Sequence, residues 1–202
     1  MRDITITRRV FMFDELTPTA QDCAYGLLCA DAWDNIDSDM VSEYLAGKFA
    51  NMADGNDDGM LDKDQLKKRY GIRIWWRVAY SQGDHASIDG VISKDNHPKL
   101  EWPDGIHTIR VKTSNLGGSI ITDLYGIDDD GGEGAYVSDP KLFEAANSFV
   151  RDICDTLYRA AVAECECYTS REYVIDTLAG YHDPRRFNDD GTYAPSQFWA
   201  AQ

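Results

Sequence analysis

The stretch that decides the fold reads Ile72-Arg73-Ile74-Trp75-Trp76-Arg77-Val78-Ala79-Tyr80. Its apolar residues occur at every second position, so Ile72, Ile74 and Trp76 fall on one face and Arg73 and Arg77 on the other. A period of two is typical of a half-buried β-strand. The stretch therefore predicts a strand with one face against the protein core.

Three more strand candidates follow this first one along the chain. They cover residues 86–92, 106–112 and 119–125. Turn-forming residues separate them, with Ser81-Gln82-Gly83-Asp84 after the first strand and Gly117-Gly118 before the last. We therefore predict an antiparallel meander of about four strands, from residue 72 to about residue 125.

Helical periodicity dominates the chain on both sides of these strands. Before them, Thr17 is a good N-cap with Pro18 at the first helical position, and a second helix is predicted at 39–52, so the two form an N-terminal helical pair. After them, Asp139-Pro140 begins a long helix that extends to about residue 165. Helices that flank a block of strands without alternating with them indicate an α+β fold.

The ends of the chain carry weaker signals. Residues 3–13 are β-rich and predict a first strand, and Thr169 followed by Glu172 is typical of a capping box that begins a short last helix closed by Gly180. We expect Trp76 and Phe149 to be buried in one core. We also expect one domain over residues 1–202, with an acidic helical part at 14–70, the sheet at 71–127, C-terminal helices at 139–180 and a tail at 181–202.

The composition limits the class of protein. The 202 residues include 20 Lys and Arg against 35 Asp and Glu, a formal net charge of −15. A surface this acidic argues against direct nucleic-acid binding, because phosphates require clustered cations. No apolar run reaches the ~18 residues of a membrane span, and the N-terminus lacks a signal-peptide segment, so we expect a cytoplasmic protein with no membrane partner. The five cysteines show no CxxC spacing, which favours free thiols.

The sharpest local motif is a twelve-residue loop at 54–65, DGNDDGMLDKDQ. It matches an EF-hand-type calcium loop at most positions, with Gly59 at the turn. The candidate metal ligands are Asp54, Asn56, Asp58, Met60 through its carbonyl, and Asp62.

The loop departs from the motif at its last position. Gln65 stands where a glutamate normally supplies two oxygens, so we expect weak calcium binding, of ~10⁻⁴ M or poorer. A polar turn between two helices that needs no ion explains the same residues.

A run of carboxylates precedes this loop. Between Val10 and Gly47 there are eight acidic residues and no Lys or Arg. Such a surface is either a solvated face that keeps the protein soluble or a binding face for a basic partner. The candidate partner-binding residues are Asp31, Asp34, Asp37, Asp39 and Glu43.

The turn after the first strand, Gln82-Gly83-Asp84-His85-Ala86-Ser87, combines an acid, an imidazole and a hydroxyl. Neighbours in a hairpin point to alternating faces, so these side chains are not placed to form a catalytic triad. We predict a tight turn with Gly83 at positive φ, and no catalytic residues.

Three segments resemble a family of small hypothetical accessory proteins of tailed bacteriophages and prophages. They are FDELTPTAQDCA, RIWWRVAYSQGDHASIDG and YTSREYVIDTLAGYHDPRRFNDDGTY. In that family we expect an FDEL-helix opening and an SQGDGAS-type turn, where this chain has His85 in place of the second glycine. The family has no established activity, so the resemblance implies only a phage protein acting in the bacterial host cytoplasm.

The sequence therefore predicts a non-enzymatic accessory protein that inhibits or modulates a host complex. The target would be a nucleic-acid-binding or anti-phage defence system with a basic surface, to which the protein presents a nucleic-acid-like negative surface. Two other classes stay open: a calcium-binding accessory module that uses the 54–65 loop, and an unrecognised metal-dependent hydrolase or nuclease.

Overall fold

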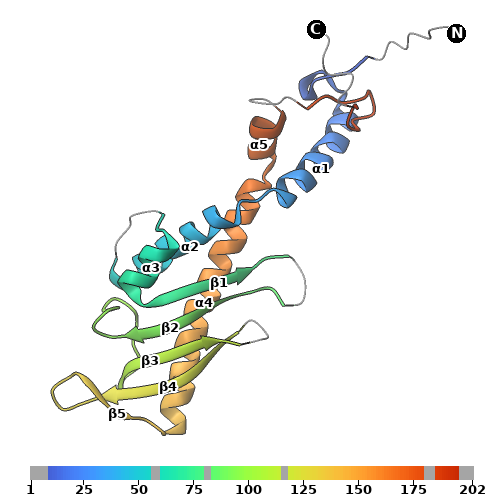
Figure 1. Ribbon diagram of the computed structural model, residues 1–202. Helices are drawn as coiled ribbons and strands as arrows, with labels where there is room; N and C mark the ends of the chain where they lie inside the picture. The colour runs from blue at the N-terminus through green and yellow to red at the C-terminus, as the bar shows by residue number, and fades with distance from the viewer. Residues whose placement is uncertain (1–8, 56–59, 80–82, 115–117, 180–184, 196–202) are drawn as a thin grey trace, which may run out of the picture. The chain divides into compact units, whose positions relative to one another are not determined.

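The structure is a computed structural model, and it describes residues 9–55, 60–79, 83–114, 118–179 and 185–195 (Figure 1). The chain divides into two compact units. Unit 1 comprises Met1–Ile36 and Cys165–Gln202, and unit 2 comprises Asp37–Glu164. The organisation as one domain stays a prediction.

Unit 2 contains the predicted antiparallel sheet, so the α+β fold is confirmed. Its five strands pair in chain order, each antiparallel to the next. They are β1 Ile72–Arg77, β2 His85–Ser93, β3 Ile106–Thr113, β4 Ser119–Ile127 and β5 Glu133–Tyr136. The fifth strand was not predicted, because its sequence EGAY shows no alternation of apolar residues.

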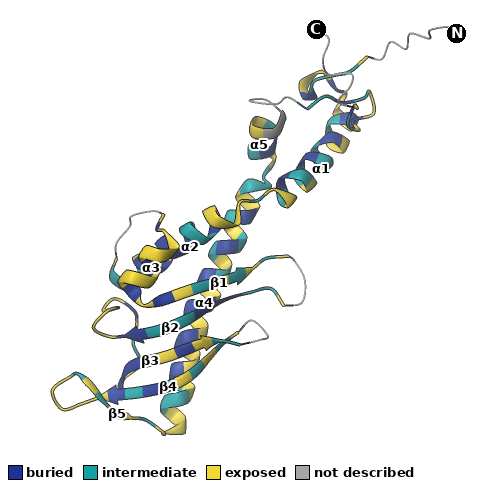
Figure 2. Cartoon of the chain, viewed as in Figure 1, coloured by how far each residue is buried: buried dark blue, intermediate teal, exposed yellow. Residues whose placement is uncertain are grey.

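The inner face of the sheet carries the aliphatic side chains. The register places Ile74 of β1 opposite Ile88 of β2, and Ile109 of β3 opposite Leu124 of β4. The long helix α4, Pro140–Tyr168, crosses this face, as predicted for 140–165 (Figure 1). Ile88, Ile109 and Leu124 are fully buried, and Figure 2 shows the alternation of buried and exposed positions along the strands.

The outer face of the sheet is polar and carries both signs of charge, since Asp89 of β2 lies opposite Arg73 of β1 and Asp123 of β4 lies opposite Arg110 of β3. No helix of unit 2 covers this face in Figure 1. Arg73, Trp75 and Arg77 alternate with the inward residues of β1, and the side chain of Trp75 is 51% exposed. Lys112 of β3 lies opposite the exposed Ile120 of β4. The predicted assignment of faces along β1 is therefore confirmed.

Trp76 departs from its expected burial. It is half-buried, and its indole N–H donates a hydrogen bond to Ser42 Oγ at 3.0 Å. Phe149 is buried as predicted, and its ring centroid lies 5.0 Å from that of Trp102. Trp76 is only half-buried because β1 is an edge strand, so its last residues have a neighbouring strand on one side only.

Two further helices of unit 2 have well-defined ends. Helix α2 spans Ser38–Asp54, in place of the predicted 39–52, and α3 spans Lys63–Tyr70. Asp37 caps α2 and Asp62 caps α3, since each carboxylate accepts backbone N–H groups of the first turn. Gly55 and Gly71 end the two helices in the left-handed region, with φ of 73° and 72°.

His97 joins α3 to the core of unit 2. The imidazole is fully buried between Phe49 and Tyr70, with ring centroids 5.6 Å and 5.9 Å away. Its Nε2 lies 3.1 Å from the Tyr70 carbonyl and its Nδ1 lies 3.1 Å from the Ser93 backbone N–H. Burial lowers the pKa of His97 from its usual 6.5, although its backbone hydrogen bonds oppose the shift.

The shift in His97 predicts acid sensitivity. Because the folded pKa is lowered, the unfolded chain takes up the proton first, so this contribution to stability is present above pH 6.5 and decreases as the pH falls below it. Urea denaturation across pH 5 to 7 measures it. We expect His97→Asn to flatten that slope. An unaltered slope in His97→Asn would assign it to other groups.

Unit 1 is built around α1, Pro18–Asp34, which begins at Thr17 as predicted. The helix packs with a 3-10 turn (η1, Phe13–Glu15), the short α5 (Arg171–Val174) and a π-helical turn (η2, Ile175–Ala179). The buried core comprises Phe13, Leu16, Ala20, Ala24, Leu28, Ala32, Val174 and Phe187. The predicted N-terminal helical pair is therefore present, with α1 in unit 1 and α2 in unit 2.

Two predictions at the chain ends need correction, and a third lies outside the described residues. Of the strand predicted at 3–13, residues 1–8 lie outside the described part, and Phe11 forms only an isolated bridge with Phe187. The cap of the last helix is Ser170, whose hydroxyl accepts from Tyr173 N–H, because Thr169 donates back to carbonyls of α4 instead. Gly180 lies outside the described residues.

The segment predicted as a tail packs on α1. Phe187 is fully buried, and its ring lies 5.5 Å from Tyr193 and 6.2 Å from Phe13, measured between centroids. Gly191 has φ of 85° and approaches the backbone of Ala20 so closely that a Cβ would lie 2.1 Å from its carbonyl oxygen. Residues 185–195 are therefore part of the unit 1 fold.

Two general expectations can be compared with the structure. No helix in the described part of the chain is long and apolar enough to cross a membrane. All five cysteines are free, with Cys154 and Cys165 buried.

Candidate functional site

The predicted calcium loop joins α2 to α3, and the structure places its ends only. Asp54 is the last residue of α2, and its Oδ2 accepts hydrogen bonds from Arg69 and from the Tyr70 hydroxyl, both at 2.8 Å. Asp62 Oδ1 accepts from the N–H of Asp64 and of Gln65 at the start of α3. Both carboxylates have structural roles that need no ion.

The structure says less about the three other predicted calcium ligands. The Met60 side chain is exposed, and Asn56 and Asp58 lie outside the described residues. Among the described residues there is no group of three or more His, Cys, Asp or Glu placed to hold a metal ion. Calcium binding at this loop stays a prediction.

Asp62 allows a test that separates the two roles of the loop. Without calcium, Asp62→Ala is expected to lower the free energy of unfolding by about 1 kcal/mol, the usual value of an N-cap. If the loop binds calcium, the loss becomes larger in millimolar calcium, because a ligand of the folded state adds to stability. Urea denaturation with chelator and with calcium measures both, and Asp64→Ala is the matched control. Equal losses under the two conditions would contradict calcium binding.

The predicted acidic face is distributed over both units. Asp31 and Asp34 belong to unit 1, whereas Asp37, Asp39 and Glu43 belong to unit 2. Each unit therefore contributes a part of the predicted face.

Asp31 has partners from the end of the chain. Its Oδ2 accepts a hydrogen bond from the Tyr193 hydroxyl at 2.7 Å and lies 3.9 Å from the Arg185 guanidinium. Burial of Tyr193, together with this bond to Asp31, raises the pKa of the phenol well above its usual 10.0. Asp31 therefore stabilises unit 1.

The other candidates differ in their surroundings. Asp37 accepts from the N–H groups of Asp39 and Met40 as the cap of α2, and Asp39 forms an ion pair with Lys63. Asp34 is exposed and Glu43 half-buried, and neither forms an ion pair within the described residues. The acidic run contains no Lys or Arg of its own, but in the fold Lys and Arg side chains from distant segments form ion pairs with some of its carboxylates.

The Asp-His-Ser turn contains no triad. Asp84 Oδ2 accepts the backbone N–H of Ala79, His85 Nδ1 contacts the Gly83 carbonyl, and Ser87 Oγ lies 3.3 Å from Thr113 Oγ1. Gly83 has φ of 100°, as predicted for a tight turn. Gln82 lies outside the described residues.

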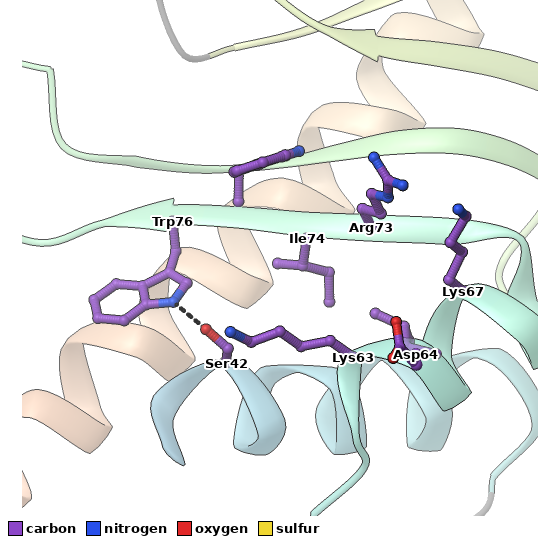
Figure 3. A pocket seen from close by; sticks show the side chains of 9 residues that line it. Ser42, Lys63, Asp64, Lys67, Arg73, Ile74 and Trp76 are labelled. Carbon is purple, nitrogen blue, oxygen red and sulfur yellow. Dashed lines mark hydrogen bonds between the residues drawn. The ribbon is translucent and has the colours of Figure 1, made fainter. Parts of the chain in front are cut away.

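The sequence reasoning missed a cleft of about 390 Å³ beside β1 (Figure 3). It lies where α2 and α3 meet the edge strand. Its lining residues are Ser42, Lys63, Asp64, Leu66, Lys67, Arg73, Ile74, Trp75 and Trp76. The lining thus combines two tryptophans with three cations, side chains whose chemistry suits planar and anionic groups.

Successive residues of β1 point to opposite sides of the strand and so reach the cleft from both sides. Figure 3 shows Ile74 and Trp76 on the side of α2, where the Trp76 indole reaches Ser42, and Arg73 on the other side. Ser42 Oγ itself donates to the Ser38 carbonyl at 2.6 Å, which fixes the hydroxyl that receives the indole N–H. The wall formed by Trp76 is therefore held in place before any ligand arrives.

The electrostatics of the cleft differ from those of the whole chain. Lys63 is paired with Asp39, and this hydrogen bond raises the pKa of the ammonium group. Lys67 and Arg73 form no ion pair with any described residue, and the lining contains one carboxylate, Asp64. The cleft is thus locally positive in a protein of net charge −15.

No protein-family model, no curated protein and no solved structure matches this chain. The resemblance to phage accessory proteins therefore stays a prediction.

Two clusters in the sequence contain residues that line the cleft. Lys67-Lys68-Arg69 and Trp75-Trp76 are concentrations of cations and of tryptophan within ten residues of one another. The turn at Gly71 reverses the chain between them, so that α3 and β1 lie against each other. Only the tertiary fold shows which of these side chains share one cavity.

Proposed function

We propose that the protein is a non-enzymatic binding protein that presents its negative charge to a basic surface of a host protein complex. The resemblance to phage accessory proteins supports the context, a bacterial cytoplasm during infection. The target class, a nucleic-acid-binding or anti-phage defence complex, follows from charge complementarity, because carboxylates occupy sites that recognise phosphates.

One observation carries this proposal. Of the eight carboxylates between Val10 and Gly47, only Asp22, Asp31 and Asp39 have cationic partners among the described residues. The other five form no ion pair there, and they are Asp14, Glu15, Asp34, Asp37 and Glu43. Unpaired exposed carboxylates accelerate the association with a basic partner, and salt weakens this effect.

The structure also decides which substitutions test the proposal cleanly. Replacing Asp31 removes the hydrogen bond from Tyr193, and replacing Asp37 removes a helix cap, so both changes would affect folding. Asp34, Asp39 and Glu43 are free of such roles apart from the surface pair of Asp39 with Lys63, which contributes little to stability.

The experiment uses capture from a bacterial lysate at low and high salt, followed by association kinetics with the purified partner. The test variant is Asp34→Asn/Asp39→Asn/Glu43→Gln. The matched control removes the same charge from the exposed β4–β5 hairpin, as Asp129→Asn/Asp130→Asn/Glu133→Gln. We expect the test variant to associate about tenfold more slowly at low salt, with a smaller salt dependence, and the control to bind normally.

Two results would contradict the proposal. Equal losses in both triple variants would mean that only the net charge matters. Unchanged association of the test variant would leave the carboxylates with a solubilising role alone. Circular dichroism and urea denaturation verify that all variants fold.

A further inference from the structure

The cleft beside β1 combines two features that point to one class of ligand. At one side, Lys67 and Arg73 line the cavity without a carboxylate partner among the described residues. At the other, Trp75 contributes an indole that is 51% exposed although it lines a cavity. Asp64 also lines the cleft and Asp89 lies opposite Arg73 in the sheet, but neither carboxylate forms an ion pair with Lys67 or Arg73, so both cations are available to stabilise a bound anion.

The exposed indole of Trp75 indicates that the anionic ligand also contains a planar ring. A half-exposed indole beside cations is a stacking surface for a planar ring, and stacking of a base on an aromatic side chain contributes about 1–3 kcal/mol. The volume of about 390 Å³ lies in the range of small-molecule sites. Figure 3 shows Arg73 projecting from β1 on the side away from α2, with Lys67 beside the start of the same strand, and the alternation along β1 assigns Trp75 to the side of Arg73.

We propose that this cleft binds a nucleotide, with a phosphate between Lys67 and Arg73 and the base against Trp75. The ligand is either a free nucleotide or one nucleotide unit of a single strand, since both offer the same base and phosphate. This site is separate from the acidic surface of the proposed function, and it needs no catalytic step.

The net charge of −15 does not oppose such a site. Charges farther away than about 8–10 Å are screened at physiological salt, so the local cations determine binding. The prediction of no direct nucleic-acid contact was drawn from the whole-chain charge, which averages over this cleft. The uncovered outer sheet face continues from Arg73 and Trp75 to Arg77 and Lys112, with the carboxylates of Asp89 and Asp123 between these cations, and it leaves room for further nucleotides of a strand.

The test measures binding of three probes to the full chain at low and moderate salt. They are adenosine monophosphate, a fluorescein-labelled oligothymidylate and inorganic phosphate. We expect Trp75→Ala to weaken nucleotide binding at least about fivefold, and Trp75→Phe to retain most of it, because phenylalanine still stacks. Lys67→Gln/Arg73→Gln should weaken binding and reduce the salt slope by about 1 to 2.

The matched control is Lys68→Gln/Lys141→Gln, which removes two exposed cations that do not line the cleft. It should leave binding within about twofold, because neither cation lines the cleft. Lys112→Gln distinguishes the two sources of the ligand, because it weakens oligothymidylate alone if a strand crosses the sheet face, and neither probe if free nucleotide is the ligand.

Three results would overturn the proposal. The first is that neither nucleotide probe binds the folded protein at millimolar concentration. The second is that phosphate binds as tightly as the nucleotide, which would leave no role for the base. The third is that the control pair loses as much affinity as Lys67→Gln/Arg73→Gln. Circular dichroism confirms folding, and Trp75 is exposed enough for its replacement to leave the core intact.

Discussion

Gly90→Ala is expected to lower the free energy of unfolding of unit 2 by about 3 kcal/mol or more. Gly90 has φ of 141°, a region that alanine avoids, and a Cβ there would lie 2.2 Å from the Gly71 carbonyl oxygen. Both clashing groups are backbone, so neither can rotate away. The pairing of β1 with β2 must therefore open locally, and urea denaturation measures the loss.

Gly83→Ala is the matched control for this substitution. Gly83 also has a positive φ, of 100°, but nothing lies within 4 Å of the position of a Cβ. The control isolates the backbone strain, which costs about 1–2 kcal/mol. If Gly90→Ala were no more destabilising than Gly83→Ala, the close approach of β1 and β2 would be wrong.

Phe187→Ala is expected to destabilise unit 1 by about 3–5 kcal/mol, the usual cost of removing a buried aromatic ring. The ring is fully buried and contacts both Phe13 and Tyr193, so its removal leaves a cavity against α1. Hydrogen exchange measured segment by segment should show faster exchange in α1 and α5, with the strands of unit 2 unchanged.

The control substitution in the same unit is expected to raise stability instead of lowering it. Gly26 lies within α1, and nothing lies within 4 Å of the position of its Cβ. Gly26→Ala is therefore expected to stabilise α1 by about 0.5–1 kcal/mol. Uniformly faster exchange in both units after Phe187→Ala would show that they unfold together.

Local signals in the sequence predicted most of the secondary structure. Thr17-Pro18 and Asp139-Pro140 mark the beginnings of α1 and α4 correctly, because caps and proline act through the nearest turn of backbone. The alternation from Ile72 identified both faces of β1. The strand β5 was missed because four residues without a periodic pattern pair only when β4 lies beside them.

The candidate sites were predicted less well, because their chemistry depends on partners distant in sequence. Asp31 was predicted to belong to a partner-binding face. Its carboxylate instead accepts a hydrogen bond from the hydroxyl of Tyr193, 162 positions later in the chain. Asp54 was predicted to bind calcium, but its carboxylate accepts hydrogen bonds from Arg69 and Tyr70. Net charge likewise gave no sign that Lys67 and Arg73 would share a cleft with two tryptophans.

The division of the chain has a consequence for protein synthesis. Unit 1 combines α1 with segments that begin at residue 165, and Phe187 closes its core. On the ribosome, α1 therefore emerges long before its packing partners, with its apolar stripe uncovered while 37–164 are translated. Unit 2 can fold during this interval, since its strands pair only with their neighbours in sequence. Unit 1 can thus assemble only after Phe187 has been synthesised, and until then the apolar stripe of α1 lacks its packing partners.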